Sequence, residues 1–188
     1  MSRFGMRALI GLVLLALCGG AAQAQVNWLP EMRAGIVARG IDANGGGLLN
    51  PGAIQDANVE LLFSAPDLNA WAVIGELRPH LGANVSFSGR DSKVYAGVSW
   101  TLQVPVLPVF VEASAGAAFS SALVSAPKGD PARNFGCAAG LRLAGSAGLQ
   151  LPAGFSLVGT LEHLPDFGAC QDPSRGATNA MVRVGVRF

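Results

Sequence analysis

Two histidines, His80 and His163, are the side chains best suited to proton transfer near neutral pH. His80 has the same spacing parity as Arg78 in a segment of alternating character, which favours a hydrogen-bonded structural role over catalysis. His163 instead follows Leu157 and Leu161 at even spacing, so its ring is expected on the apolar face of its segment. A histidine at the edge of such a face could act as a general base on a substrate that lies against it.

These histidines belong to short segments in which apolar and polar side chains alternate. Such alternation predicts β-strands, because successive side chains of a strand point to opposite faces. Most of the segments have about the nine to eleven residues that a tilted strand needs to cross a bilayer. The eight segments are residues 31–40, 56–64, 77–88, 92–102, 108–119, 133–149, 154–164 and 178–188.

The two faces of these segments differ in character. Apolar residues on one face include Val59, Leu61, Phe63, Leu81, Ala83, Val85, Phe87, Val94, Ala96, Val98, Trp100, Leu141 and Leu143. The other face has mostly small residues, with Arg33, Glu60, Arg78, His80, Glu112, Arg142, Glu162, Arg183 and Arg187 among them. A lipocalin-like soluble barrel would need an outer face rich in Lys, Glu and Asp. A narrow membrane barrel instead holds paired charges inside and turns its apolar face to lipid.

Composition supports the membrane alternative. Charged residues make up 13% of the chain and hydrophobic residues 51%, whereas a soluble domain has about a quarter charged residues. Beyond the amino-terminal run, no apolar stretch reaches the roughly 20 residues of a membrane helix. We therefore predict an all-β fold, an eight-stranded antiparallel transmembrane β-barrel of the outer-membrane type, in the bacterial outer membrane. A soluble periplasmic binding barrel is the alternative.

The beginning of the chain is typical of a secretory signal peptide. Residues 1–24 combine Arg3 and Arg7 with an apolar run and a small-residue cleavage motif, which leaves 25–188 as the barrel domain. A lipid anchor on Cys18 is disfavoured because a leucine precedes it. Removing the two arginines lowers the basic count from 13 to 11 against 12 acidic residues, a net charge of −1. With no basic patch, we predict no nucleic-acid partner.

The predicted strand directions bring aromatic residues and cysteines to the barrel rims. With both termini periplasmic, the two rims collect Phe63, Trp100, Phe155 and Phe188 on the periplasmic side and Phe87, Phe119 and Phe135 on the outer side. Cys137 and Cys170 then share the outer end in an oxidising compartment, so we predict a disulfide between them, with two free thiols as the alternative. Without CxxC or ligand-spaced histidines, we predict no metal or redox site.

Several stretches, taken in order, carry a family resemblance. They are Arg78-Pro79-His80-Leu81-Gly82-Ala83-Asn84, Val94-Tyr95-Ala96-Gly97-Val98-Ser99-Trp100, Phe110-Val111-Glu112-Ala113, Gly136-Cys137, and Glu162-His163 through Cys170 to Val186-Arg187-Phe188. The chain from about Arg33 to Phe188 resembles the lipid A 3-O-deacylase (acyloxyacyl hydrolase-like) family. The resemblance implies an eight-stranded outer-membrane barrel that hydrolyses the ester at position 3 of lipid A, without a cofactor.

The family motif is only partly present. Members use His-x-Ser-Asn with a later acidic residue: the histidine deprotonates the serine, the carboxylate orients the histidine, and the asparagine helps to hold the oxyanion. His163 matches the motif, but Pro165 stands at the serine position and Asp166 at the asparagine position. Residues 175–179, where the acidic partner is expected, contain no carboxylate. Proline has no hydroxyl to acylate, so we do not expect the family reaction in its usual form.

Ser174 is a candidate replacement for the missing nucleophile, with Asp166 or Asp172 orienting His163. A loop serine that follows a proline more often has a turn role. The sequence therefore supports two hypotheses for the function of a membrane barrel. One is a lipid A ester hydrolase, and the other is a catalytically inactive barrel that binds lipopolysaccharide or stabilises the envelope. In both, the expected partners are lipid A or lipopolysaccharide and the outer-membrane lipids.

Overall fold

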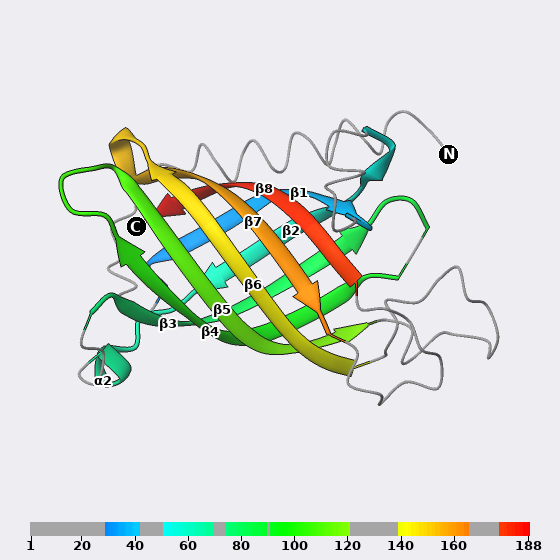
Figure 1. Cartoon of the computed structure of the whole chain (residues 1–188), viewed down its shortest axis with the longest axis horizontal. Coiled ribbons are helices and arrows are strands. Elements are labelled where there is room, and N and C mark those ends of the chain that lie inside the picture. Colours follow the sequence, from blue (N-terminus) through cyan, green and yellow to red (C-terminus); the bar gives the residue numbers. More distant parts are fainter. Residues whose placement is uncertain (1–28, 42–50, 70–73, 90, 121–138, 166–176) are drawn as a thin grey trace.

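A closed antiparallel β-barrel forms the body of the protein (Figure 1). The computed structural model describes residues 29–41, 51–69, 74–89, 91–120, 139–165 and 177–188. Each strand pairs with its neighbours in sequence, and the last strand closes the barrel on the first. Residues 1–24 lie outside the described residues, so their role as a signal peptide stays a prediction.

The strands are β1 (Glu31–Arg39), β2 (Ile54–Leu62), β3 (Glu76–Ser86), β4 (Lys93–Gln103), β5 (Val109–Ser120), β6 (Ala139–Gln150), β7 (Phe155–Leu164) and β8 (Ala177–Arg187). Three short helical turns accompany them: η1 (Pro51–Ala53), α2 (Pro66–Asn69) and η2 (Pro152–Gly154). All eight predicted strands are present, with ends that differ by one or two residues. The exception is the sixth, whose predicted first residues fall outside the described part of the chain. No helix among the described residues is long and apolar enough to cross a membrane.

The barrel has two distinct ends, which we name the terminal end and the loop end. At the terminal end, on the left of Figure 1, β1 begins and β8 ends. Residues 63–75, 104–108 and 151–154 join the strands there. At the loop end, strands are connected by residues 40–53, 87–92, 121–138 and 165–176.

Apolar side chains cover the outward face of the strands. Val59, Leu81, Val94, Leu161 and Val182 are each about half exposed, although all belong to regular strands. Such a continuous apolar exterior is the surface that bilayer hydrocarbon covers in a membrane barrel. The predicted transmembrane fold is therefore confirmed, and the lipocalin-like alternative is wrong because the apolar face points outward.

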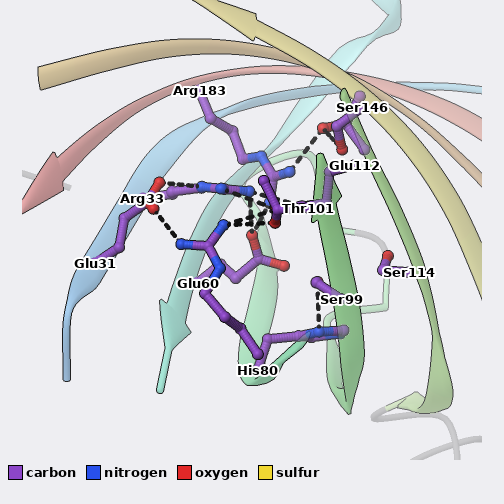
Figure 2. Close-up of polar contacts among 12 residues, drawn as sticks. Glu31, Arg33, Glu60, His80, Ser99, Thr101, Glu112, Ser114, Ser146 and Arg183 are labelled. Atoms are coloured by element: carbon purple, nitrogen blue, oxygen red, sulfur yellow. Dashed lines mark hydrogen bonds and ion pairs between the residues drawn. The ribbon is translucent and has the colours of Figure 1, made fainter. Parts of the chain in front are cut away.

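Paired charges fill the lumen near the terminal end (Figure 2). Arg33 Nε lies 2.6 Å from Glu31 Oε1, and Arg33 Nη1 lies 2.8 Å from Glu112 Oε1. Arg78 joins the same two carboxylates at 2.6 and 3.0 Å, while the Thr101 hydroxyl donates to Glu112. All five side chains are buried. The pairing of opposite charges offsets the cost of removing them from water.

A second polar cluster fills the lumen toward the loop end. Glu162 accepts hydrogen bonds from Arg142 Nε at 2.7 Å, from Asn179 Nδ2 at 3.1 Å and from Lys93. The Arg142 guanidinium lies 4.0 Å from the centre of the Tyr95 ring. The charged residues predicted to face inward are therefore confirmed as lumen residues. Arg187 differs from the others because its side chain, at the terminal end, is 41% exposed.

Aromatic residues mark both rims. Phe63, Phe155 and Phe188 lie at or next to strand ends on the terminal side. Trp100 lies in the terminal-side part of β4, and its indole donates to the Ile74 carbonyl at 2.8 Å. Phe87 and Phe119 are exposed at the loop end. Phe135 lies outside the described residues. Within the described part of the chain, the predicted aromatic placement is confirmed.

Candidate active site

His163 and Thr178 form a polar pair on the outward surface at the loop end. The two residues are direct partners in the β7–β8 register. His163 is exposed and Thr178 is half-buried. The His163 Nδ1 and Thr178 Oγ1 atoms lie 2.9 Å apart, which is hydrogen-bonding distance. The pair therefore stands at the edge of the apolar belt, where polar and apolar surroundings meet.

The alternation within β7 explains why His163 faces outward. Leu157 and Leu161 share its face, whereas Thr160 and Glu162 point into the lumen and are buried. A shift of one residue in register would exchange the two faces and carry His163 inside. The Glu162 hydrogen bond to Asn179, 3.1 Å long and directly beneath the pair, opposes such a shift.

The hydrogen bond between His163 and Thr178 has two chemical forms, depending on the imidazole tautomer. In one, the Thr178 hydroxyl donates to Nδ1, and the imidazole is poised to accept that proton. In the other, Nδ1–H donates to the hydroxyl, and Nε2 is left as the basic nitrogen. Nε2 has no hydrogen-bond partner among the described residues. Either form keeps one basic nitrogen at the surface.

Most of the other predicted site residues lie outside the part of the chain that the structure describes. Pro165 follows β7 directly and is half-buried. Asp166, Asp172 and Ser174 lie outside the described residues, and so do Cys137 and Cys170. Their catalytic roles and the disulfide therefore stay predictions. Thr178 was missed in the sequence, although it lies in the range where an acidic partner for His163 was expected.

His80 has the structural role that its position predicts. Its Nδ1 lies 3.0 Å from Ser99 Oγ, and its Nε2 lies 3.4 Å from Arg142 Nη1. The ring also meets Tyr95 edge-on, with centroids 5.9 Å apart. His80 is buried in the lumen, where a lipid substrate cannot reach it, and both ring nitrogens are occupied.

The His163–Thr178 pair has no metal-binding cluster beside it in the described part of the chain. Among the described residues, no group of three or more His, Cys, Asp or Glu side chains could hold a metal ion. A pocket of about 240 Å³ lies at the terminal end, opposite the pair, and is lined by Glu31, Phe110, Gln150, Leu151, Gly154, Phe155, Ser156 and Arg187. Because His163 lies on the exposed outward surface, a molecule that contacts its ring would approach from the side of the membrane.

Comparison with known proteins shows the fold. No family model and no curated protein matches the chain. The crystal structure of the outer membrane enzyme PagL aligns with a TM-score of 0.51 and 15% identity, over 84% of this chain and 99% of the other. The Yersinia pestis outer membrane protein Ail, in a phospholipid bilayer nanodisc, gives a TM-score of 0.51 and 10% identity, over 86% and 99%. The chain thus has the fold of a bacterial outer-membrane barrel.

Proposed function

We propose that this protein hydrolyses an ester of lipid A at the outer surface of the bacterial outer membrane, with His163 as the general base. The observation that carries this function is the exposed His163 ring, hydrogen-bonded to the Thr178 hydroxyl at the edge of the apolar belt. The sequence resemblance to lipid A 3-O-deacylases supports the choice of substrate. The fold is shared with an outer membrane enzyme, PagL, which is compatible with catalysis on this scaffold.

The position of the pair at the loop end supports this choice of substrate. With both chain termini on the periplasmic side, the loop end reaches the outer leaflet, which contains lipid A. The acyl chains of a bound lipid would lie along the exposed side chains of Leu161 and Val182. Its ester carbonyls, at the boundary of the hydrocarbon, would then lie beside His163. A substrate held by the bilayer needs no deep pocket.

The chemistry required of His163 is proton transfer. The imidazole removes a proton from the attacking hydroxyl and returns it to the departing sugar hydroxyl. The products are a free hydroxy fatty acid and a lipid A molecule with one acyl chain fewer. These steps use no cofactor.

Mass spectrometry of lipid A tests this function. The protein is expressed in the outer membrane of a host without lipid A deacylase activity, and its folding is checked by heat-modifiable gel mobility. We expect the loss of a mass equal to one hydroxy fatty acid, and we expect His163→Ala to prevent that loss. His80→Ala, folded to the same extent, is the control and should retain the activity. Unchanged lipid A in the presence of the folded wild-type barrel would contradict the proposal.

A catalytically inactive barrel that binds lipopolysaccharide is the second candidate. Pro165 favours it, because the residue at the family's serine position has no hydroxyl. In this case His163→Ala would leave the envelope's resistance to detergents intact, whereas removal of the whole protein would lower it. The lipid A of the wild-type barrel distinguishes the two candidates, because the first predicts the loss of one hydroxy fatty acid and the second predicts no change.

A further inference from the structure

Thr178 supplies a hydroxyl in contact with His163, where an ester hydrolase without the family serine would need one. Its Oγ1 lies 2.9 Å from His163 Nδ1, and the hydrogen bond is exposed on the outward face. This inference rests on the proposed ester hydrolysis and names its nucleophile. We propose that Thr178 Oγ1 attacks the ester carbonyl and that His163 Nδ1 accepts its proton.

The position of Thr178 is set by strands on both sides. Its cross-strand partner is His163 on β7, and its carbonyl accepts a hydrogen bond from the Ile41 amide, just after β1, at 3.0 Å. The branched Cβ of threonine restricts rotation of the side chain. A nucleophile held in this way keeps its distance from the base, since strands position catalytic groups more precisely than loops do.

Buried neighbours stabilise the same arrangement from below. Asn179, next to Thr178, donates to Glu162, next to His163, at 3.1 Å. Arg142 and Lys93 also bind the Glu162 carboxylate. The buried polar cluster around Glu162 therefore lies directly inside the His163–Thr178 pair and fixes the ends of β7 and β8 relative to each other.

The reaction balances with water as the only other reactant. Thr178 Oγ1 forms a bond to the ester carbon as its proton moves to His163 Nδ1. The ester C–O bond then breaks, and the departing oxygen takes the proton from the imidazolium. Water attacks the acyl-threonine, His163 takes one proton from it, and the Thr178 oxygen leaves with that proton. One fatty acid and one free hydroxyl result, with no change in oxidation state.

A reagent that modifies activated hydroxyls tests the nucleophile without requiring lipid A. The full-length barrel in detergent micelles is treated with a long-chain alkyl fluorophosphonate, and the labelled peptide is identified by mass spectrometry. We expect one label, on Thr178, and we expect His163→Ala to abolish it. Ser174→Ala should be labelled like the wild type. A label on Ser174, or none at all on the folded barrel, would overturn the proposal.

Three substitutions at Thr178 separate a nucleophile from a residue that merely orients His163. Serine retains the hydroxyl, whereas asparagine has no hydroxyl but can still form a hydrogen bond to His163. Valine has the shape of threonine but neither a hydroxyl nor any other hydrogen-bonding group. We expect Thr178→Ser to retain lipid A hydrolysis, and Thr178→Asn and Thr178→Val to lower it at least roughly 100-fold. Asparagine activity equal to that of serine would show an orienting role and overturn the nucleophile.

The same experiments separate this inference from the proposed function. If Thr178→Val still hydrolysed lipid A, the proposed function would hold, but Thr178 could not be the nucleophile. Labelling of Thr178 with unchanged lipid A would instead support an activated threonine that acts on another ester. Because the side chain faces outward and fills no part of the lumen, all three variants should fold, as gel mobility can verify.

Discussion

At the scale of single residues, the charges that matter most for stability are those sealed in the lumen. Glu162 is fully buried, and its carboxylate accepts hydrogen bonds from Arg142, Lys93 and Asn179. Removing its charge would leave two buried cations without their shared partner. The loss of a partner in a buried ion pair is costly, because the remaining charge stays desolvated.

Glu162→Gln is therefore expected to lower the free energy of unfolding by about 3–5 kcal/mol. Urea titration of the barrel in lipid vesicles measures this change. Glu76→Gln is the matched control: Glu76 is half-buried at the terminal end, and no ion pair of it is found among the described residues. It should change stability by less than about 0.5 kcal/mol. Equal effects of the two variants would contradict the importance of the buried cluster.

At the scale of strands, glycines make room for large side chains in a narrow lumen. The Tyr95 ring on β4 lies over Gly82 on β3, and a Cβ at position 82 would come within 2.3 Å of Tyr95 Cζ. Tyr95 in turn accepts a hydrogen bond from Asn58 at 2.9 Å and supports the Arg142 guanidinium. The packing of Tyr95 on β4 against β3 thus depends on the absence of a side chain at Gly82.

Gly82→Ala is expected to destabilise the barrel by about 1–3 kcal/mol, because the Tyr95 ring must move. Gly145→Ala provides the comparison, since a Cβ there meets nothing within 4 Å. That second variant should be neutral or stabilising by up to about 1 kcal/mol, through the reduced freedom of the unfolded chain. Both values come from the same urea titration, and a reversed order would refute the packing argument.

At the scale of the whole molecule, the barrel is inverted relative to a soluble protein. Ion pairs occupy its interior, and apolar side chains occupy its exterior. Val94 and Val98 lie on the outward face of β4, at the loop end and in the middle of the strand, respectively. In a bilayer, Val98 should therefore lie deep in the hydrocarbon and Val94 close to the headgroups.

Val98→Arg is expected to cost about 2–4 kcal/mol in a bilayer, and Val94→Arg only about 0–1 kcal/mol. The difference arises because a guanidinium near the headgroups stays hydrated, whereas one at mid-strand is surrounded by hydrocarbon. Unfolding in lipid vesicles gives both values. Similar costs at the two positions would mean that the apolar belt does not lie across the bilayer as assigned.

Local alternation was sufficient to predict the strands and their two faces. The period of two is a property of each strand alone, so Val94 and Arg33 could be assigned to opposite faces without knowledge of their neighbours. The placement of His163 on the outward face follows from the same rule. Strand ends were less certain: β2 begins at Ile54, two residues before its expected start.

Partnerships across the barrel needed the tertiary structure. Arg33 meets Glu112, and Arg183 meets Glu60, only because closure brings strands that are distant in sequence around one lumen. The hydrogen bond between His163 and Thr178 likewise depends on the β7–β8 register, which is set by pairing along the whole strand. Residue spacing defines which way a side chain points, but register and closure decide what it touches.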